Sequence, residues 1–587
     1  MPAPATPYVK GSTNTSSPLL EPKEIEPIEK NLFTRVWLTR FRPFGVDAQP
    51  IVEPAEAALR GHSPAEVITI KDLGQWDSPL LTDRNQLKAG IIGVEVKTRE
   101  QLELEEVLLD RQSTISERFT ALKGLMTLVE EGKIVPPKPI PESNNHIHTW
   151  ASFSPYSPAA AVWASYLAGL EVTGIIDHDT IAGNYEFMEA ARICKIKATN
   201  GFELRTNAGD DPELKGLVWN YPGMPGVIYF LAHAIPEGRL SEFQTEIIDG
   251  IHEAKDRRNR TMIEGGVFRG LYDGVERDIE CKGVNGLLTE MGAGFTIDYD
   301  RDVVPLTFKE GDSSEHTENS TDRHIMLAVA RKINENVPPE ARAEFLTRLF
   351  GRPLSDKEVK MMGNEEDFKD LLRAGLLKPK SEKTPNSVLI NPDERECPNI
   401  KEVSAKIKKL GGIPVYAYLG DPTCQEEQNL EKIVQYLADS GVEGIALMPH
   451  RNTPEQIERI SKLANKYGLL VISGVDINRP EQPLIHHRAK AEDYPEFRTA
   501  ANAMIGHERM SVFGDCGFLS DTLATAIPDR VQRLQFLAKV GRLKGISEDS
   551  IHALSSKPPE EVIRLIDAGL RELGDARLYD AELRVAA

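Results

Sequence analysis

The sequence predicts an α/β fold built on a parallel sheet or barrel and interrupted by a long helical insertion. Short apolar runs alternate with helical patterns after residue 143, which is typical of βα units. The same alternation returns after residue 400. Because the stretch between these two parts has helical patterns and few strand-like runs, we expect the two parts to form one interrupted domain.

Length and composition indicate a large globular protein. A chain of 587 residues exceeds what one hydrophobic core usually organises, so two or three domains, or one domain with a large insertion, are expected. The hydrophobic fraction of 40% and the charged fraction of 27% are ordinary for a soluble globular protein.

The charge balance is acidic. The 90 Asp and Glu residues exceed the 70 Lys and Arg residues, which leaves a formal charge of -20. Such a surface should repel nucleic acid, so a broad polynucleotide-binding face is not expected. A small phosphorylated substrate remains compatible with this charge, because a metal ion and a few basic groups can make one pocket positive. The oligomeric state is left open.

The cysteines and the N-terminal segment bear on the cellular compartment in which the protein is expected to work. The five cysteines form no CxxC pair, so neither a disulfide framework nor a zinc ribbon is indicated, and buried free thiols are expected. The first 30 residues lack the apolar core of a signal peptide, and no later stretch is apolar enough to span a bilayer. We therefore expect a cytoplasmic protein without a membrane partner.

The N-terminal part precedes the predicted barrel. Residues 1–30 are rich in Pro, Ser, Thr and Glu, which predicts a disordered tail. Residues 31–135 form a mixed accessory region with an apolar stretch at Ala89 to Val96 and a charged helical stretch from Arg99 to Glu131. The proline-rich segment IVPPKPIPES, which ends at Ser143, is typical of a linker.

Four further regions follow the linker. Residues 144–235 alternate strand-like NNHIHT and VTGIIDHDT with helix-like segments, and form the first part of the predicted barrel. Residues 236–399, with SEFQTEIIDGIHEAKDRRNR and TDRHIMLAVARKINEN, are the predicted helical insertion. Residues 400–485, with GGIPVYAYLGD, VEGIALMPH and LLVISGVDIN, are the second part of the barrel. Residues 486–587 show apolar residues at helical spacing and predict a helical C-terminal region.

A pair of histidines ends the first of these strands. His146 and His148 are two residues apart, so the alternation of a strand points both imidazoles to the same face, where they can share one ion. In a barrel the C-terminal end of a strand is where catalytic ligands lie. An HxH pair alone is common by chance.

Three titratable residues follow the apolar run VTGII. Asp177, His178 and Asp179 cannot be buried unpaired without a cost of several kcal/mol, so a metal ion or a dense hydrogen-bond network is required. The alternative is an ordinary βα turn in which Asp179 or Thr180 caps the next helix.

Two carboxylates follow other strand-like runs. Glu203 lies in NGFELRT, and Asp476 follows GLLVIS. Together with His146 and His148 they give two imidazoles and two carboxylates from separate strand ends. This mixed nitrogen and oxygen set suits zinc, manganese or iron better than calcium, so a divalent metal is the expected cofactor.

The order of these motifs resembles the polymerase and histidinol phosphatase (PHP) superfamily. The resemblance covers roughly residues 144 to 235 and 400 to 480: HxH, strand-DHD-helix, a glutamate, GGIPV, GVEGI and GxDxN. It implies a distorted (β/α)7, TIM-like barrel with up to three metal ions, and a hydrolase that attacks a phosphate ester with a metal-activated water. By resemblance His146, His148, Glu203 and Asp476 form the first metal site, Glu203 bridges to a neighbouring ion, and His178 belongs to the second site.

The sequence departs from the family pattern at several ligand positions. Phe153 stands where an Asp or His is usual, Tyr229 where a histidine is usual, Tyr418 in the AH-like dipeptide, and Asn478 at the closing histidine. Tyrosine and asparagine are weaker donors to zinc-like metals than imidazole. We therefore predict one or two ions per chain. The alternative is a non-catalytic metal-binding module with a regulatory or partner-binding role.

Further candidates lie at the predicted mouth of the barrel. His450, a catalytic candidate together with His178, could protonate a leaving group, and Arg451 could contact a phosphate. The alternative is a solvated turn. Arg205 and Arg479 are weaker substrate-binding candidates.

The remaining basic residues receive more ordinary interpretations. His233 or the pair His486-His487 could replace a missing ligand, although loop histidines are more often merely exposed. The cluster KDRRNR at Lys255 to Arg260 is predicted to be a solvated helix face. Arg323 and His324 are predicted to serve helix packing and surface charge.

Overall fold

The structure is a computed structural model. It describes residues 98–152, 154, 156–209, 211–222, 224–272, 275–307, 319–478, 482–579 and 581–585, together with the short backbone strands β1 (Ile68–Thr69) and β2 (Gly93–Val94). The predicted tail and most of the apolar stretch Ala89 to Val96 lie outside these residues.

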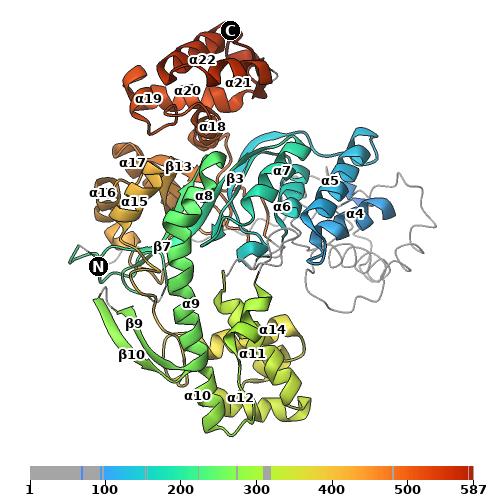
Figure 1. The fold of residues 1–587 in the computed structure, drawn as a ribbon, viewed down its shortest axis with the longest axis vertical. Coiled ribbons are helices and arrows are strands. Elements are labelled where there is room, and N and C mark those ends of the chain that lie inside the picture. The colour runs from blue at the N-terminus through green and yellow to red at the C-terminus, as the bar shows by residue number, and fades with distance from the viewer. Residues whose placement is uncertain are drawn as a thin grey trace, which may run out of the picture.

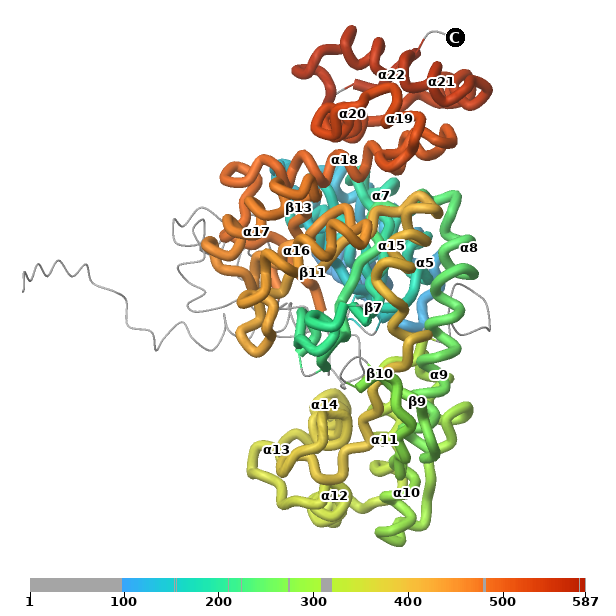
Figure 2. Tube along the Cα trace, turned by 90° about the vertical axis from the view of Figure 1, so that its left-hand side faces the viewer, coloured from blue at the N-terminus to red at the C-terminus, as the bar shows by residue number. Residues whose placement is uncertain are grey.

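The described chain is a mixed α/β fold with parallel strands at its centre. Helices cover the outside of the strands, the segment between the two halves extends away from one end, and the C-terminal helices extend from the other (Figure 1). Figure 2 shows the same three-part arrangement after a quarter turn. None of the helices in the described ranges is long and apolar enough to cross a membrane.

Two sheets carry the first half of the centre. Three parallel strands form one sheet in the order β3 (Ile140–Ile147), β4 (Leu170–Ile175), β6 (Lys197–Thr199). Ile176 alone separates β4 from β5 (Asp177–His178), and Asn200 alone separates β6 from β7 (Gly201–Asn207). Since β5 pairs in parallel with β7, the neighbouring sheet continues the same two strand directions.

The second sheet joins both halves of the chain. Its order is β13-β12-β11-β8-β7-β5, with β8 (Val227–His233), β11 (Ile413–Tyr418), β12 (Gly444–Leu447) and β13 (Leu470–Ser473). Strands β8 and β11 flank the insertion and pair directly, with His233 opposite Ile413. Unlike the other strands of this sheet, β8 runs antiparallel to both of its neighbours. An all-parallel arrangement, which the alternation favoured, therefore does not hold at β8.

The two sheets also meet at the far side. Ile147 at the end of β3 forms a parallel bridge with Ile477, just beyond β13. The His148 N–H donates to the Ile477 carbonyl at 3.3 Å, and the Ile477 N–H donates to the His146 carbonyl at 3.2 Å. These bonds bring the HxH motif next to the segment that carries Asp476.

Helices of the βα units pack on the outer faces of the strands. They are α6 (Pro158–Leu167), α7 (Asn184–Cys194), α15 (Ile400–Lys409), α16 (Leu430–Asp439) and α17 (Pro454–Lys466). The charged N-terminal stretch forms two helices, α4 (Arg99–Leu109) and α5 (Ile115–Glu130). A buried Arg118–Glu186 ion pair of 2.7 Å ties α5 to α7, so these helices are attached to the central fold.

Alternation along β11 places successive residues in two different apolar clusters. Tyr416 and Tyr418 belong to the apolar cluster that includes Ile433 of α16. Val415 and Ala417 belong to the cluster on the opposite face. Because successive strand residues point to opposite faces, Tyr418 is directed away from the side that bears Ala417.

The insertion contains its own apolar core and one hairpin. Its helices are α8 (Leu240–Phe243), α9 (Asp249–Glu264), α10 (Gly283–Glu290), α11 (Asp322–Asn336), α12 (Arg342–Phe350), α13 (Asp356–Met361) and α14 (Glu365–Leu376). Ile325, Phe350 and Phe368 are fully buried in its core. Strands β9 (Gly266–Tyr272) and β10 (Val275–Cys281) pair antiparallel, a feature that the helical prediction missed although an Asp-Gly dipeptide lies between them.

The C-terminal region is helical, as predicted. It comprises α18 (Pro495–Ser511), α19 (Asp521–Ala526), α20 (Arg530–Arg542), α21 (Glu548–Ser555) and α22 (Pro559–Leu573), with the short strands β14 (Gly545–Ile546) and β15 (Glu582–Leu583). A Cβ on Gly506 of α18 would lie 1.9 Å from the Leu537 carbonyl oxygen of α20. Glycine therefore permits the close packing of these two helices. All five cysteines are free and buried.

Glu426, in the loop between β11 and α16, makes stability depend on pH. Its buried carboxylate accepts hydrogen bonds from the Tyr416 hydroxyl at 2.6 Å and the Gly420 N–H at 2.9 Å. Burial raises the pKa of Glu426 from 4.5 to about 7. A raised folded-state pKa means that its stabilising contribution is complete below the unfolded pKa and is lost as pH rises through 7, a change of about 3 kcal/mol.

We expect Glu426→Gln to flatten the dependence of the unfolding free energy on pH between 4.5 and 7. Urea unfolding at a series of pH values measures this slope. The exposed Glu402→Gln variant serves as the control and should keep the wild-type slope. An unchanged slope in the Glu426 variant would show that this carboxyl titrates normally.

Candidate metal centre

Two buried imidazoles form the base of the candidate site. His146 and His148 lie at the C-terminal end of β3, are 2% and 1% exposed, and have ring centroids 5.1 Å apart. The His146 N–H donates to the Asn144 side-chain oxygen at 3.0 Å, which fixes the backbone at the start of the motif. Both imidazoles therefore face the same side of the strand, as the spacing predicts.

Glu203 of β7 faces three imidazoles. Its Oε2 lies 3.2 Å from His146 Nε2 and 3.9 Å from His148 Nε2, and its Oε1 lies 3.4 Å from His178 Nδ1. The His148 and His178 rings stack with centroids 4.4 Å apart. Ligand atoms of His146, His148 and Glu203 all lie within 4.8 Å of one another, a spacing at which one ion could be held.

Asp476 lies on the other side of His148. Its Oδ1 is 3.2 Å from His148 Nε2, and its Oδ2 is 3.4 Å from a guanidinium nitrogen of Arg451. The Asn478 amide also donates to Oδ1. The segment after β13 thus brings a second carboxylate to the imidazoles.

The electrostatic balance keeps both carboxylates charged. Burial alone raises the pKa of Glu203 and Asp476, but the neighbouring histidines outweigh it and hold both pKa values below their ordinary range. Burial alone lowers the pKa of His148, yet Asp476 and Glu203 raise it overall. Burial lowers the pKa of His178 to about 4, so its ring is neutral at neutral pH.

These residues fit a divalent metal ion. Nδ1 of His146 and Nδ1 of His148 are buried without a hydrogen-bond partner among the described residues, and Nε2 of His146 faces the Glu203 carboxylate at 3.2 Å without hydrogen-bond geometry. Buried polar atoms in this state are costly, and a cation would satisfy nitrogen lone pairs that face the cluster. Two imidazoles and two carboxylates also form the donor set that zinc, manganese and iron accept.

Protein partners satisfy the two aspartates beside His178. Asp177 accepts from the Thr149 N–H and hydroxyl, both at 2.6 Å, and from the Ser152 hydroxyl at 2.5 Å. Asp179 pairs with Lys255 Nζ at 2.5 Å. The alternative of a helix cap at Asp179 or Thr180 is wrong, because α7 begins at Asn184 after Gly183.

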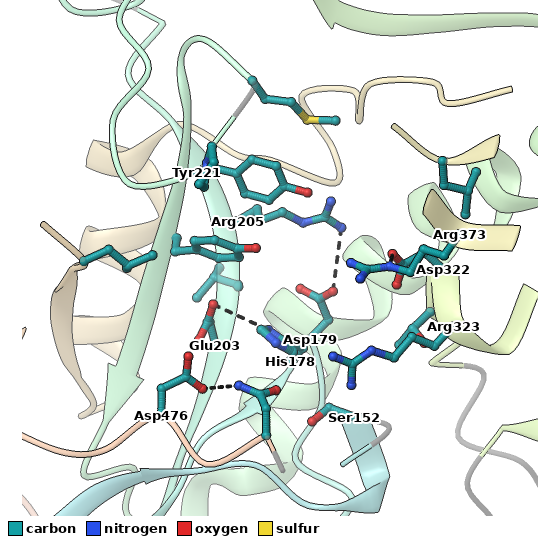
Figure 3. A pocket seen from close by; sticks show the side chains of 18 of the residues that line it. Ser152, His178, Asp179, Glu203, Arg205, Tyr221, Asp322, Arg323, Arg373 and Asp476 are labelled. Atoms are coloured by element: carbon teal, nitrogen blue, oxygen red, sulfur yellow. Dashed lines mark hydrogen bonds and ion pairs between the residues drawn. The ribbon is translucent and has the colours of Figure 1, made fainter. Parts of the chain in front are cut away.

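A cavity of about 660 Å³ opens beside the cluster. His178, Glu203 and Asp476 line one side, and Arg323 and Arg373 of the insertion face them from the other side (Figure 3). Seven basic and four acidic side chains line it: Arg205, Lys255, Arg258, Arg323, Arg373, Lys378 and Arg451, and Asp179, Glu203, Asp322 and Asp476. The lining therefore has a formal charge of +3, in contrast to the acidic chain as a whole.

The other predicted site residues differ in their placement. His450 and Arg451 line the cavity, with Arg451 Nε 3.3 Å from His450 Nε2. Burial lowers the pKa of His450 to about 4. Arg205 also lines the cavity, where it pairs with the buried Glu396 and lies 3.9 Å from Asp179. Arg479 lies outside the described residues.

Of the positions that depart from the family pattern, two line the cavity and a third packs away from it. Tyr229 lines the cavity, with its ring centroid 6.3 Å from that of His178. Asn478 lines it too and is engaged with Asp476. Tyr418 instead packs in the apolar cluster that includes Tyr416 and Ile433. Phe153 lies outside the described residues.

The histidines proposed as replacement ligands do not line the cavity. His233 is buried at the end of β8, opposite Gly201 at the start of β7. His486 and His487 stack on each other with ring centroids 4.4 Å apart. Neither group belongs to the set of ligand atoms, from His146, His148 and Glu203, that lie within 4.8 Å of one another.

Sequence reasoning missed the contribution of the insertion. The prediction of a solvated face for KDRRNR is wrong at Lys255 and Arg258, which are 4% and 7% exposed and line the cavity. They share a helix face with the buried Ile251 and Met262, and this spacing was the available signal. Arg323, interpreted as surface charge, also lines the cavity, whereas His324 is buried and accepts the Thr321 N–H at 3.0 Å.

Comparisons with known proteins give one curated relative. No family model matches the chain. The sequence is 32% identical over 131 residues to a 5'-3' exoribonuclease of Haemophilus influenzae, a match that covers 22% of this chain and 47% of the relative. The chain thus spans about half the length of the curated relative that it matches.

Two solved structures align with larger parts of the chain. A candidate metal-dependent phosphoesterase from Bifidobacterium adolescentis is 21% identical, with a TM-score of 0.38, and the alignment covers 62% of this chain and 97% of that structure. An amidohydrolase from Chromobacterium violaceum is 15% identical, with a TM-score of 0.36 and coverages of 61% and 96%.

Proposed function

We propose that this protein is a metal-dependent hydrolase of phosphate esters that acts on a small phosphorylated substrate. The observation that carries the proposal is the buried group of His146, His148 and Glu203, joined by Asp476 at the edge of a cavity with positively charged lining. A divalent ion and basic side chains together favour an anionic ester over a neutral substrate.

We further propose that the strands close into the distorted (β/α)7 barrel implied by the family resemblance. The pairing of β3 with β4, the order of the second sheet and the Ile147–Ile477 bridge support this proposal. Strand β4 continues into β5 after Ile176, β6 continues into β7 after Asn200, and the bridge links the end of β3 to the segment after β13. The two interruptions at Ile176 and Asn200 and the antiparallel β8 are its distortions.

The proposed first site consists of His146, His148, Glu203 and Asp476. Because the second oxygen of Glu203 faces His178, Glu203 could bridge to a second ion beside that histidine. One or two zinc, manganese or iron ions per chain are proposed. When bound, such an ion acts as a Lewis acid and lowers the pKa of water, which supplies a nucleophile near neutral pH.

The proposed role of the surrounding residues is to bind and orient the ester. Arg451 is fixed beside Asp476 and can donate to a phosphate oxygen. Burial lowers the pKa of His450 to about 4, so its ring is neutral at neutral pH and is suited to accept a proton from water or substrate rather than to protonate the leaving group. Arg205 lines the cavity but is held by Glu396, so its role is to contribute positive charge.

Metal content and phosphate release test the proposal directly. Protein purified without chelator should contain zinc, manganese or iron by elemental analysis, and should release phosphate from monoesters in a metal-dependent assay. Asp476→Ala should lose metal and activity together, because it removes a carboxylate 3.2 Å from His148 Nε2. Equal metal content and equal turnover in this variant would refute the assigned site.

The curated relative favours a second candidate substrate. Since that protein is named a 5'-3' exoribonuclease, the same site could act on a phosphodiester at the end of a nucleic acid. The acidic charge of the chain argues against a long polynucleotide. Comparing hydrolysis of a phosphate monoester with that of a short single-stranded RNA distinguishes the two.

A non-catalytic metal-binding module is the alternative that the departures from the family pattern favour. Asn478 stands in the position of the closing histidine and its amide is engaged with Asp476. This reading predicts retained metal, no hydrolysis of any phosphate ester, and a large loss of thermal stability on chelation.

A further inference from the structure

The insertion closes the cavity with a charged wall opposite the metal centre. We call Asp322, Arg323, Arg373 and Lys378 the insertion wall; all four line the cavity. Asp322 and Arg323 begin α11, Arg373 lies in the last turn of α14, and Lys378 follows that helix. Figure 3 shows Asp322, Arg323 and Arg373 of the wall across the cavity from Glu203 and Asp476.

The wall has more positive than negative charge. Asp322 pairs with Arg373, and although burial raises the pKa of Asp322, the neighbouring arginines hold it below its ordinary range. One carboxylate therefore faces three cations. Thr321, the N-cap of α11, also lines the cavity, so the partial positive charge of the helix N-terminus points the same way.

Lys378 is available to a ligand. Its ammonium group forms no ion pair with any described residue. Burial lowers the pKa of Lys378, and the nearby positive charge of Arg373 lowers it further. A bound anion would relieve this repulsion.

The deeper cations of the cavity are already paired. Arg205 and Arg258 both contact Glu396, and Lys255 pairs with Asp179 at 2.5 Å. At the metal end Arg451 pairs with Asp476. The insertion wall therefore adds Lys378, which has no carboxylate partner among the described residues, to the positive charge of the lining.

We infer that the insertion wall is a subsite for a second anionic group of the substrate, a phosphate or a carboxylate. The scissile phosphate belongs at the metal end beside His178, Glu203 and Asp476, and a cavity of about 660 Å³ is large enough to hold a ligand that reaches both ends. The inference rests on the proposed function for the identity of the ester. The substrate is thus a phosphate ester with a distal anionic group.

Calorimetric binding of phosphonates tests this subsite without requiring hydrolysis. The carbon–phosphorus bond is not cleaved, so full-length protein as purified can be titrated with alkyl monophosphonates and with alkane bisphosphonates of three, four or six carbons. A series with a distal carboxylate distinguishes the two anion types. The wild type should bind the best-fitting dianionic ligand at least about tenfold more tightly than its monophosphonate.

Two variants test whether the tighter binding of dianionic ligands depends on the insertion wall. Lys378→Met and Arg323→Met should each reduce the affinity for the dianionic ligand about tenfold and leave the monophosphonate affinity unchanged. Lys380→Met removes the same charge from an exposed position that does not line the cavity, and should bind both ligands as the wild type does.

The outcomes separate this inference from the proposed function. Equal affinity of the wild type for the monophosphonates and all dianionic ligands, or an advantage that both wall variants keep, would overturn the subsite. Absence of metal-dependent phosphate release would overturn the hydrolase instead. A dianionic advantage that disappears in the wall variants supports the subsite whether or not hydrolysis is seen.

Discussion

Glu203→Gln is expected to abolish both metal binding and phosphate release. The carboxylate of Glu203 lies within 3.2–3.9 Å of His146, His148 and His178, so it contacts every imidazole of the site. Glutamine keeps the size of the side chain but removes its charge and replaces one acceptor oxygen by a donor. We expect a loss of metal affinity beyond the roughly 10–100-fold typical of residues that only support a ligand.

Elemental analysis and the phosphate-release assay measure this effect. Glu142→Gln is the matched control, because Glu142 lies near the start of β3, at the opposite end of the strand from His146 and His148. The control should retain metal and activity. Normal metal content in the Glu203 variant would place the ion elsewhere in the protein.

Glu396→Gln is expected to cause the largest loss of stability. Glu396 is fully buried and accepts two hydrogen bonds from Arg258, at 2.6 and 2.8 Å, while also pairing with Arg205. Removal of its charge leaves the buried Arg258 without its ion-pair partner and leaves Arg205 with only Asp179, at 3.9 Å. Breaking a buried pair in this way typically costs about 3–5 kcal/mol.

Chemical denaturation compares the two proteins, and the neighbouring Glu394→Gln provides the control. Glu394 is exposed, so its substitution should change the unfolding free energy by no more than about 0.5 kcal/mol. If the Glu396 variant were as stable as the wild type, the link between β7, α9 and the end of the insertion would contribute little to the fold.

Much of the candidate centre could be predicted from strand ends. The spacing of His146 and His148 gives a common face, and Glu203 and Asp476 follow apolar runs whose ends meet in the structure. These residues share a local signal, a polar side chain in or just after a buried strand: His146 lies near the end of β3, Glu203 lies within β7, and Asp476 follows β13. The structure places His146, His148 and Glu203 within reach of one ion.

The opposite side of the cavity could not be predicted in the same way. Arg373 and Lys378 lie in the insertion, and their position depends on how α11 and α14 pack against the central fold. A helical pattern shows which face is apolar but not which neighbour a charged residue meets. The prediction that Lys255 and Arg258 lie on a solvated helix face fails because both are buried in ion pairs. Their partners, Asp179 and Glu396, lie elsewhere in the sequence, and the helical pattern does not reveal them.

The direction of strand β8 also could not be predicted from the pattern of apolar residues. The apolar run of β8 identifies a buried strand, but alternation and burial are the same for either direction of the chain. Its antiparallel pairing with β7 and β11 arises from the connections that precede and follow it.

The direct pairing of β8 with β11 has a consequence for how this architecture can vary. Because His233 at the end of β8 lies opposite Ile413 at the start of β11, a short turn could in principle join the two strands. Strand order would then place no demand on the length of the intervening chain, and extending such a connection costs little entropy. A protein with this strand order could exchange the insertion between β8 and β11 while keeping the strands that carry the candidate metal centre. New ligand specificities could then arise by replacement of the insertion alone.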